Sequence, residues 1–272
     1  MQVSATFVMT IYEVSINMDY IFEQLLLFSI SIIANGLSAM AGGGAGLLQF
    51  PALLFLGLSF SVALATHKVA SVALGVGATF RHLKEKRLSW KFAAHILVFG
   101  LPGVILGAML ILSVPDDLAK MALGILTIGL GLYSWFQPDL GLHAKPKSFS
   151  TGQWFIGGSI LFLIGVLNGS ITSGTGLFVT LWLVRWYGLD YQRAVAYTLI
   201  LVGMIWNGVG AFTLATQSPV RWEWVLPLVL GALLGGYLGA HLSLVKGNKL
   251  VKRCFESVTI LVGLSLLLDG SV

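Results

Sequence analysis

The sequence predicts an all-α polytopic membrane protein with two inverted repeats, each a broken-helix hairpin plus three transmembrane helices. Three observations predict this fold. Hydrophobic residues make up 57% of the 272 residues, charged residues make up only 10%, and the mean hydropathy is +0.90. Apolar runs long enough to cross a bilayer as helices recur along the chain. A pattern of small and polar residues also occurs twice, with a spacing of about 132 residues.

The composition excludes several classes of protein. A soluble domain carries about 25% charged residues, so this chain lacks the polar side chains to cover a surface in water. The net charge of +5 lies mainly in loops between apolar runs, which predicts membrane orientation and no nucleic-acid partner. Because Cys254 is the single cysteine, an internal disulfide and a cysteine zinc cluster are excluded. We expect no cofactor and no metal.

Eight long apolar runs predict helices because they do not alternate as barrel strands do. Two shorter pieces, Leu47–Gly57 and Gly176–Tyr187, each cover less than about 20 Å and are too short to cross alone. The eight long runs are Ile21–Ala41, Ser61–His82, Phe92–Ser113, Leu118–Phe136, Gly152–Thr172, Tyr191–Leu214, Trp222–Val245 and Lys249–Leu268.

A glycine-rich break precedes each short piece. The first break contains Gly42, Gly43, Gly44 and Gly46, and the second contains Gly174 and Gly176. Close helix packing is the alternative explanation for such glycines. Their density in front of a short apolar piece favours a helix that is broken inside the membrane.

The two halves repeat one design. Asn35-Gly36 recurs as Asn168-Gly169, and Gly107-Ala108 recurs as Gly239-Ala240. We therefore predict an extracytoplasmic tail over residues 1–20, a first transmembrane repeat over 21–136, a cytoplasmic linker over 137–151 and a second repeat over 152–268. The glycines spaced by three or four residues in the two halves could pack helices within one chain or between two.

Charge gives the relative orientation of the repeats. Loop 81–91 is basic, whereas its counterpart 214–221 carries only Arg221; the next pair of loops shows the reverse pattern. By the positive-inside rule, equivalent loops then lie on opposite sides of the membrane. Loops 81–91, 137–153, 185–193 and 243–253 are predicted inside and hold 13 of the 16 Lys and Arg residues. Both termini are predicted to be extracytoplasmic.

Two broken helices facing each other predict an anion site. A helix that begins after a glycine turn presents free N–H groups and the positive end of its dipole. The polar side chains near both breaks are neutral, whereas a cation site would be expected to contain a carboxylate. Each Ser or Thr could instead bond its own helix backbone. The expected substrate-binding residues are Asn35, Gly43, Gly44, Gly46, Gln49, Asn168, Ser170, Thr172, Ser173, Thr175 and Gly176.

Lys68 is the most informative single residue because it lies within a predicted helix. A charge at that depth costs about 2.5–3.5 kcal/mol on insertion scales, so we expect it to bind the anion; snorkelling to the outer interface is the alternative. His67 beside it could carry a proton. Glu256 in the last helix is predicted to pair with Arg253 at the interface.

Residues 25–268 resemble the sulfite exporter TauE/SafE family, also called toluene-sulfonate uptake permeases. The resemblance rests on Asn35-Gly36, the glycine run to Gly46 with Phe50-Pro51, the segment Ala194–Thr198 and Asn207-Gly208. It implies a multi-pass protein of the bacterial inner membrane whose substrate is sulfite, sulfoacetate or another sulfonate, moved by export. It also adds Thr198 and Asn207 to the expected site. The second break departs from the family pattern because it has fewer glycines and no following proline.

We therefore expect a secondary transporter that works by alternating access around a midplane site. An anion channel, or a transporter for a non-sulfur organic anion, is the alternative. An enzyme is not expected, because the chain has no G-x-S-x-G and no H-E-x-x-H motif. The expected partners are the substrate and the lipid bilayer. Proton or sodium coupling and a homodimer stay open.

The predicted topology can be tested with single cysteines at positions 86, 117, 218 and 248 in a Cys254→Ser background. Positions 86 and 248 should react with an impermeant thiol reagent from the cytoplasmic side, and positions 117 and 218 from the opposite side. Labelling of 86 and 218 from the same side would contradict the inverted repeats.

Overall fold

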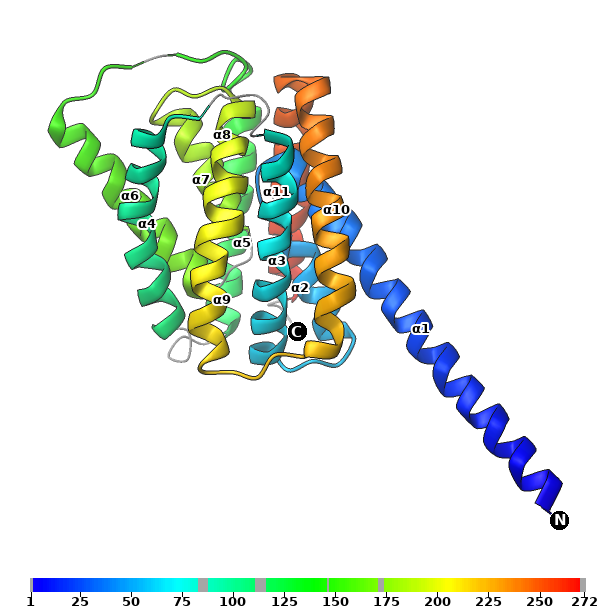
Figure 1. Cartoon of the computed structure of the whole chain (residues 1–272). Helices are drawn as coiled ribbons and strands as arrows, with labels where there is room; N and C mark the ends of the chain where they lie inside the picture. Colours follow the sequence, from blue (N-terminus) through cyan, green and yellow to red (C-terminus); the bar gives the residue numbers. More distant parts are fainter. Residues whose placement is uncertain (1, 83–87, 111–115, 146, 171–173, 270–272) are drawn as a thin grey trace.

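The computed structural model describes residues 2–82, 88–110, 116–145, 147–170 and 174–269 (Figure 1). Within these ranges the regular elements are all helical. The first half contains α1 (Gln2–Ala41), α2 (Gly46–Phe55), α3 (Phe60–His82), α4 (Trp90–Leu110) and α5 (Asp116–Trp135). The second half contains α6 (Thr151–Ser170), α7 (Thr175–Arg185), α8 (Tyr191–Tyr197), the π-helical segment η3 (Thr198–Trp206), α9 (Asn207–Ala215), α10 (Trp222–Lys246) and α11 (Asn248–Asp269).

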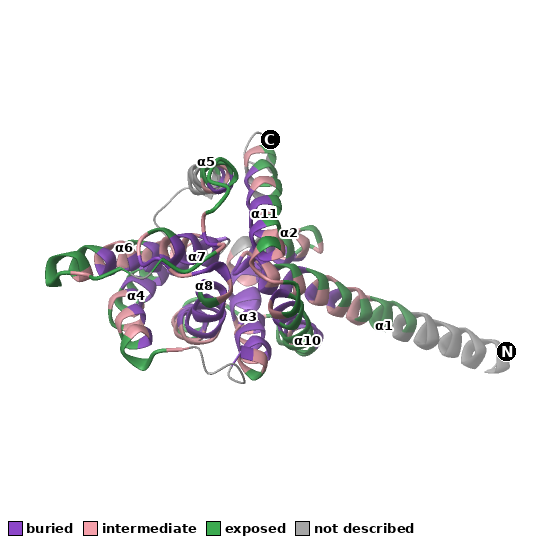
Figure 2. Ribbon diagram, turned by 90° about the horizontal axis from the view of Figure 1, so that it is seen from above, coloured by how far each residue is buried: buried purple, intermediate pink, exposed green. Residues whose placement is uncertain are grey.

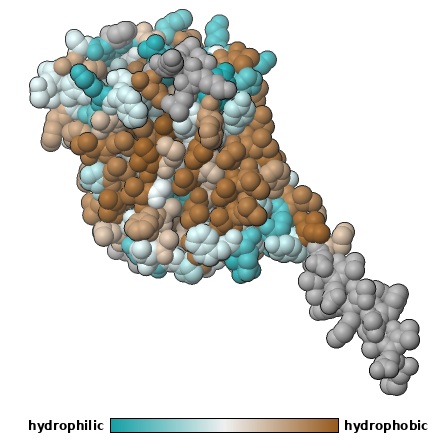
Figure 3. All heavy atoms as spheres, viewed as in Figure 1, coloured by the Kyte–Doolittle hydropathy of each residue, from teal (hydrophilic) through white to brown (hydrophobic). Residues whose placement is uncertain are grey.

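The chain is a multi-pass membrane protein. Among the described residues, six helical spans are long and apolar enough to cross a bilayer: Met18–Ala41, α3, α4, α6, the continuous Tyr191–Ala215 and α10. The helices α5 and α11 are 20 and 22 residues long, which also matches the thickness of a bilayer core. Figure 3 shows a hydrophobic belt between two polar ends, as a protein surrounded by lipid requires.

The first helix begins earlier than the sequence analysis expected. We predicted a helix from Ile21, whereas α1 begins at Gln2 and extends beyond the bundle (Figure 1). Residues 2–20 contain neither glycine nor proline, so no helix breaker separates them from the apolar run that follows.

The first helix of each half packs against a helix of the other half. Helix α1 packs most extensively against α10, and its counterpart α6 packs against α4. The two most buried spans, α3 and Tyr191–Ala215, pack against each other. Figure 2 shows α1 and α6 on opposite flanks with α3 and α8 between them. Each half thus supplies one flank helix and one central helix to the same bundle.

Glycines set the two flank contacts within the chain. A Cβ on Gly103 or Gly107 of α4 would collide with the carbonyl oxygens of Phe162 or Val166 in α6. In the same way, Gly231, Gly235 and Gly239 of α10 face the carbonyl oxygens of Phe28, Ile32 and Gly36 in α1. These glycines therefore let helix backbones within one chain approach closely, which is how small residues act in membranes.

Loops gather at two ends of the bundle. Figure 1 shows the ends of α3, α5, α7 and α10 at one end, together with the starts of α4, α6, α8 and α11. The loop 216–221 and the end of α11 lie at the opposite end. The described Lys and Arg residues at the first end, which we call the basic end, are Arg81, Lys91, Lys145, Lys147, Arg185, Arg193, Lys246, Lys249, Lys252 and Arg253.

A buried ion pair within α11 hydrogen-bonds to Ser134 of α5 at the basic end. The Lys252 Nζ lies 2.7 Å from the Glu256 Oε1, and both side chains are almost fully buried. The prediction that Glu256 pairs with Arg253 is therefore wrong, because Lys252 faces α5 while Arg253 is exposed. The Ser134 hydroxyl also donates to Glu256 at 3.0 Å, and Lys252 donates to the Ser134 carbonyl at 2.7 Å.

We predict that Glu256→Ala lowers the free energy of unfolding by about 3–5 kcal/mol, because it leaves the Lys252 ammonium buried without its carboxylate. Glu223→Ala is the matched control, since Glu223 pairs with Arg221 at 2.9 Å on an exposed surface and should cost less than about 1 kcal/mol. Thermal unfolding in detergent measures both. Equal effects of the two substitutions would show that the Lys252–Glu256 pair contributes no more than a surface pair.

Candidate functional site

The two glycine breaks are in backbone contact inside the bundle. Gly42, Gly43 and Gly44 have φ values of +86°, +140° and +97°, which glycine adopts far more readily than other residues. A Cβ on Gly43 would lie 2.7 Å from the Gly176 Cα, and one on Gly176 would lie 2.9 Å from the Gly43 Cα. The hydroxyl of Thr180 in α7 donates to the Gly42 carbonyl at 2.7 Å. The short helices α2 and α7 therefore begin next to each other.

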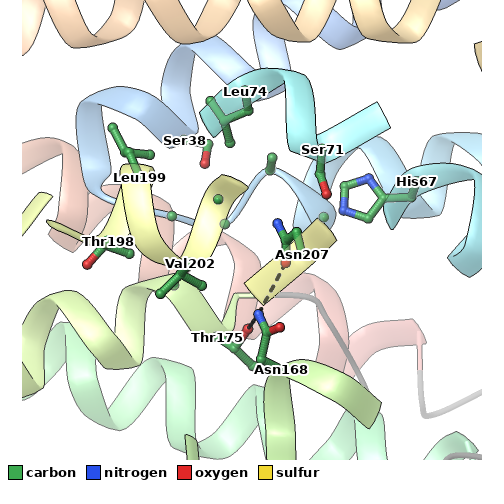
Figure 4. A pocket seen from close by; sticks show the side chains of 16 residues that line it. Ser38, His67, Ser71, Leu74, Asn168, Thr175, Thr198, Leu199, Val202 and Asn207 are labelled. Carbon is green, nitrogen blue, oxygen red and sulfur yellow. Dashed lines mark hydrogen bonds between the residues drawn. The ribbon is translucent and has the colours of Figure 1, made fainter. Parts of the chain in front are cut away.

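A small cavity lies where these breaks meet α3 and η3. Its volume is about 30 Å³, which is room for about two water molecules. Figure 4 shows that side chains from both halves of the chain surround it. The lining residues are Ser38, Gly43, Gly44, Ala45, Gly46, His67, Ser71, Leu74, Asn168, Thr175, Gly176, Thr198, Leu199, Val202, Gly203 and Asn207.

Two polar side chains in the cavity wall have no protein partner. The Ser38 Oγ and the His67 Nδ1 make no hydrogen bond with any residue that the structure describes, although each residue is only 1% exposed. Figure 4 shows the His67 ring next to Ser71 at one side of the cavity. An unsatisfied buried polar group costs about 1–3 kcal/mol, so a small polar molecule in the cavity would relieve that cost.

Nine of the predicted site residues line this cavity. They come from the first break, from α3, from α6 and α7, and from the Tyr191–Ala215 helix. Residues that are far apart in the sequence therefore meet at the cavity. These residues are Gly43, Gly44, Gly46, His67, Asn168, Thr175, Gly176, Thr198 and Asn207.

The other predicted site residues that the structure describes do not line this cavity. Asn35 donates to the Gln49 side-chain oxygen at 2.7 Å, in a separate buried cluster with Ser31. The Ser31 hydroxyl donates to the Leu228 carbonyl at 2.6 Å, so this cluster ties the first hairpin to α10. Ser170 donates to the Val166 carbonyl of its own helix at 2.9 Å, which is the backbone bonding considered as the alternative. Thr172 and Ser173 lie outside the described residues.

Lys68 lies directly behind the cavity wall. Its side chain is fully buried, and its ammonium donates to the Asn168 carbonyl at 2.7 Å and to the Asn168 side-chain oxygen at 3.0 Å. A longer contact of 3.5 Å reaches the Asn207 side-chain oxygen. Lys68 therefore does not snorkel to an interface. Among the described residues no carboxylate pairs with it.

Asn168 extends the Lys68 contacts to the second break. Its side-chain nitrogen donates to the Thr175 hydroxyl at 2.8 Å and lies 3.4 Å from the Asn207 side-chain oxygen, as the dashed lines in Figure 4 show. Lys68 thus connects α3 directly to α6 and α9, and through Asn168 to α7.

The π-helical segment η3 shapes one side of the cavity, and the sequence analysis missed it. We expected one continuous α-helix from Tyr191 to Leu214, whereas nine residues, Thr198–Trp206, are π-helical. π-Helical turns are rare and often occur at functional sites. Thr198, Leu199, Val202 and Gly203 of η3 line the cavity.

Ser38 and Ser71 are further lining residues that the sequence analysis missed. Helical spacing could have identified them, because Ser38 follows Asn35 by three residues and Ser71 follows His67 by four. The apolar lining residues Leu74, Leu199 and Val202 carry no comparable signal, since apolar residues occur throughout these helices.

A family model and several relatives with similar sequences all describe membrane transporters. Residues 27–266 match the family model described as sulfite exporter TauE/SafE. The chain is 30% identical to the probable membrane transporter protein ORF9 of Sinorhizobium, over 92% of this chain and 95% of that protein. It is 29% identical to the probable membrane transporter protein YfcA of Escherichia coli K12, over 90% of each chain. It is 28% identical to a probable membrane transporter protein of Haemophilus influenzae, over 84% of this chain and 88% of that protein. No solved structure matches the chain.

We predict that Gly176→Leu inserts into the membrane but melts at a lower temperature, because its side chain would push the two breaks apart. Overpacking of this kind costs about 1–3 kcal/mol. Gly208→Leu is the control, since a Cβ at Gly208 meets nothing within 4 Å. Thermal unfolding of both purified variants gives the comparison, and identical melting would mean that the contact between the breaks is loose.

Proposed function

The chain belongs to the sulfite exporter TauE/SafE family, and on this premise we propose that it is a secondary transporter of a small sulfur-containing anion. The proposed substrates are sulfite, sulfoacetate and other sulfonates. The proposed direction is export, which is the direction that the family description names. We place the protein in the bacterial inner membrane with its basic end in the cytoplasm and both termini outside. Transport, without enzymatic turnover, is the proposed activity.

The observation that carries this proposal is the buried Lys68 charge. A cation removed from water costs several kcal/mol unless an opposite charge compensates it. Three oxygen contacts at Asn168 and Asn207 compensate Lys68 in part, and no carboxylate does so among the described residues. An anion in the adjacent cavity would supply the missing negative charge, and the cavity would have to widen for an anion larger than about two water molecules.

The cavity also offers groups that can donate hydrogen bonds to an oxyanion. The Ser38 hydroxyl is unpartnered and can donate, and the His67 Nδ1 can donate when it carries the ring proton. The starts of α2 and α7 each present about half a positive charge from the helix dipole. The helix-dipole charges, the hydroxyl and the ring N–H face the cavity, and the Lys68 ammonium lies behind its wall. This arrangement suits an oxyanion with several acceptor oxygens.

We propose that anion binding and movement of the second hairpin are coupled through Lys68. In the structure, Lys68 holds Asn168, which in turn holds Thr175 at the start of α7. An anion that attracts the ammonium would compete with the Asn168 oxygens and weaken this link. The second hairpin could then move relative to α3 and open the site to one side, as alternating access requires.

We predict that Lys68→Met weakens binding of sulfite or sulfoacetate at least tenfold, which corresponds to about 1.4 kcal/mol. The reason is that Met keeps the length of the side chain but removes its charge. Lys68→Arg should be only partly tolerated, because guanidinium is larger and planar. Isothermal titration calorimetry of the purified protein with sulfite, sulfoacetate and acetate measures the affinities.

Lys91→Met, which removes an exposed lysine, is the matched control and should bind as the native chain does. An unchanged dissociation constant for Lys68→Met would overturn the role of Lys68. Tighter binding of acetate than of either sulfur anion would instead favour a non-sulfur organic anion. Counterflow in liposomes separates a transporter from a channel, because a channel shows no trans-stimulation.

A further inference from the structure

A second basic site lies at the basic end, away from the cavity between the breaks. It is an open pocket of about 680 Å³ between the end of α5, the linker and the start of α11. Its lining residues are Trp135, Pro138, Leu142, Lys249, Lys252, Arg253, Glu256 and Ser257. We call it the α5–α11 pocket.

The charge of the α5–α11 pocket comes from two exposed cations. Lys252 and Glu256 neutralise each other at 2.7 Å. Lys249 and Arg253 are exposed, lie one helical turn apart on α11, and pair with no carboxylate among the described residues. The pocket therefore has two unneutralised positive charges for an anionic group to bind.

The helix faces that run from the pocket are apolar. Along α11, the positions that follow Lys249 and Arg253 at three- or four-residue spacing are Ser257 and then Leu261, Leu264 and Leu268, and these leucines are exposed. On α5, the exposed apolar residues Trp135, Leu132, Ile125 and Met121 lie three, seven and four residues apart, which places them on one face of the helix. Each face thus changes from polar or aromatic at the basic end to apolar in the hydrophobic belt.

We propose that the α5–α11 pocket binds the headgroup of an anionic phospholipid, with the acyl chains lying along α5 and α11. Lys249 and Arg253 match the phosphate by charge, and basic pockets between transmembrane helices on the cytoplasmic side are suited to such headgroups. Exposed Trp135 has the amphipathic ring that is favoured at the membrane interface. A soluble anion would use the two cations but would leave the leucine face unused.

Native mass spectrometry of the delipidated full chain tests this proposal. The probes are phosphatidylglycerol and phosphatidylcholine with identical acyl chains. We expect one phosphatidylglycerol to bind about twenty-fivefold more tightly than phosphatidylcholine, since each of the two basic residues near a membrane surface contributes about a fivefold factor. Lys249→Gln with Arg253→Gln should remove this preference, whereas Lys249→Arg with Arg253→Lys should keep it.

The matched control is Lys91→Gln with Lys145→Gln, which removes the same charge from exposed lysines outside the α5–α11 pocket. It should bind phosphatidylglycerol as the native chain does. An equal loss of preference in the control would overturn the site in favour of general surface charge. Displacement of the lipid by millimolar inorganic phosphate would mean a soluble-phosphate site, and a dimer mass that the Gln pair abolishes would mean that a second copy covers this face.

Discussion

Backbone polar groups in a membrane must be satisfied within the protein, and this constraint governs the arrangement of the whole bundle. A helix break at membrane depth costs several kcal/mol for each unpaired group unless protein or a polar cavity surrounds it. The chain has two such breaks and places them against each other, with Gly43 in contact with Gly176. The central helix α3 and the π-helical segment η3 enclose them. The cavity forms where the two breaks meet, because residues of both breaks, of α3 and of η3 surround it there.

The two halves of the chain carry different side chains at corresponding positions of the sequence. The segment Ala63–Thr66, with the sequence Ala-Leu-Ala-Thr, also recurs as Ala194–Tyr197, with the sequence Ala-Val-Ala-Tyr. This correspondence makes Thr198 the counterpart of His67 and Leu199 the counterpart of Lys68. Both His67 and Thr198 line the cavity. Lys68, the buried charge beside the cavity, therefore comes from the first half of the chain, and its hydrogen-bond partners come from the second half. Both halves contribute a glycine break to the cavity, whereas only the first half contributes the lysine beside it.

Two buried lysines show two ways to compensate a charge in this chain. Lys252 has Glu256 and two backbone carbonyls, which together link α5 and α11. Lys68 has amide and carbonyl oxygens of Asn168 and Asn207, which are dipoles without a net charge. The first arrangement is complete without a ligand, because the carboxylate neutralises the ammonium. The second leaves a positive charge next to a polar cavity, and this contrast supports the proposal of an anionic substrate.

The sequence alone determined the apolar spans, the glycine breaks and the grouping of Lys and Arg in a few loops, because these depend on the length of apolar runs, on glycine and on the positions of Lys and Arg. It also placed Gly43, His67, Asn168 and Gly176 in one site. It determined neither the start of α1 nor the π-helical segment η3. Only the tertiary structure decided which partner each buried polar group takes. Lys252 and Arg253 both satisfy helical spacing to Glu256, and packing against α5 selected Lys252. The contacts of Lys68 cross 100 and 139 residues of chain, and no local pattern encodes a contact between helices that far apart.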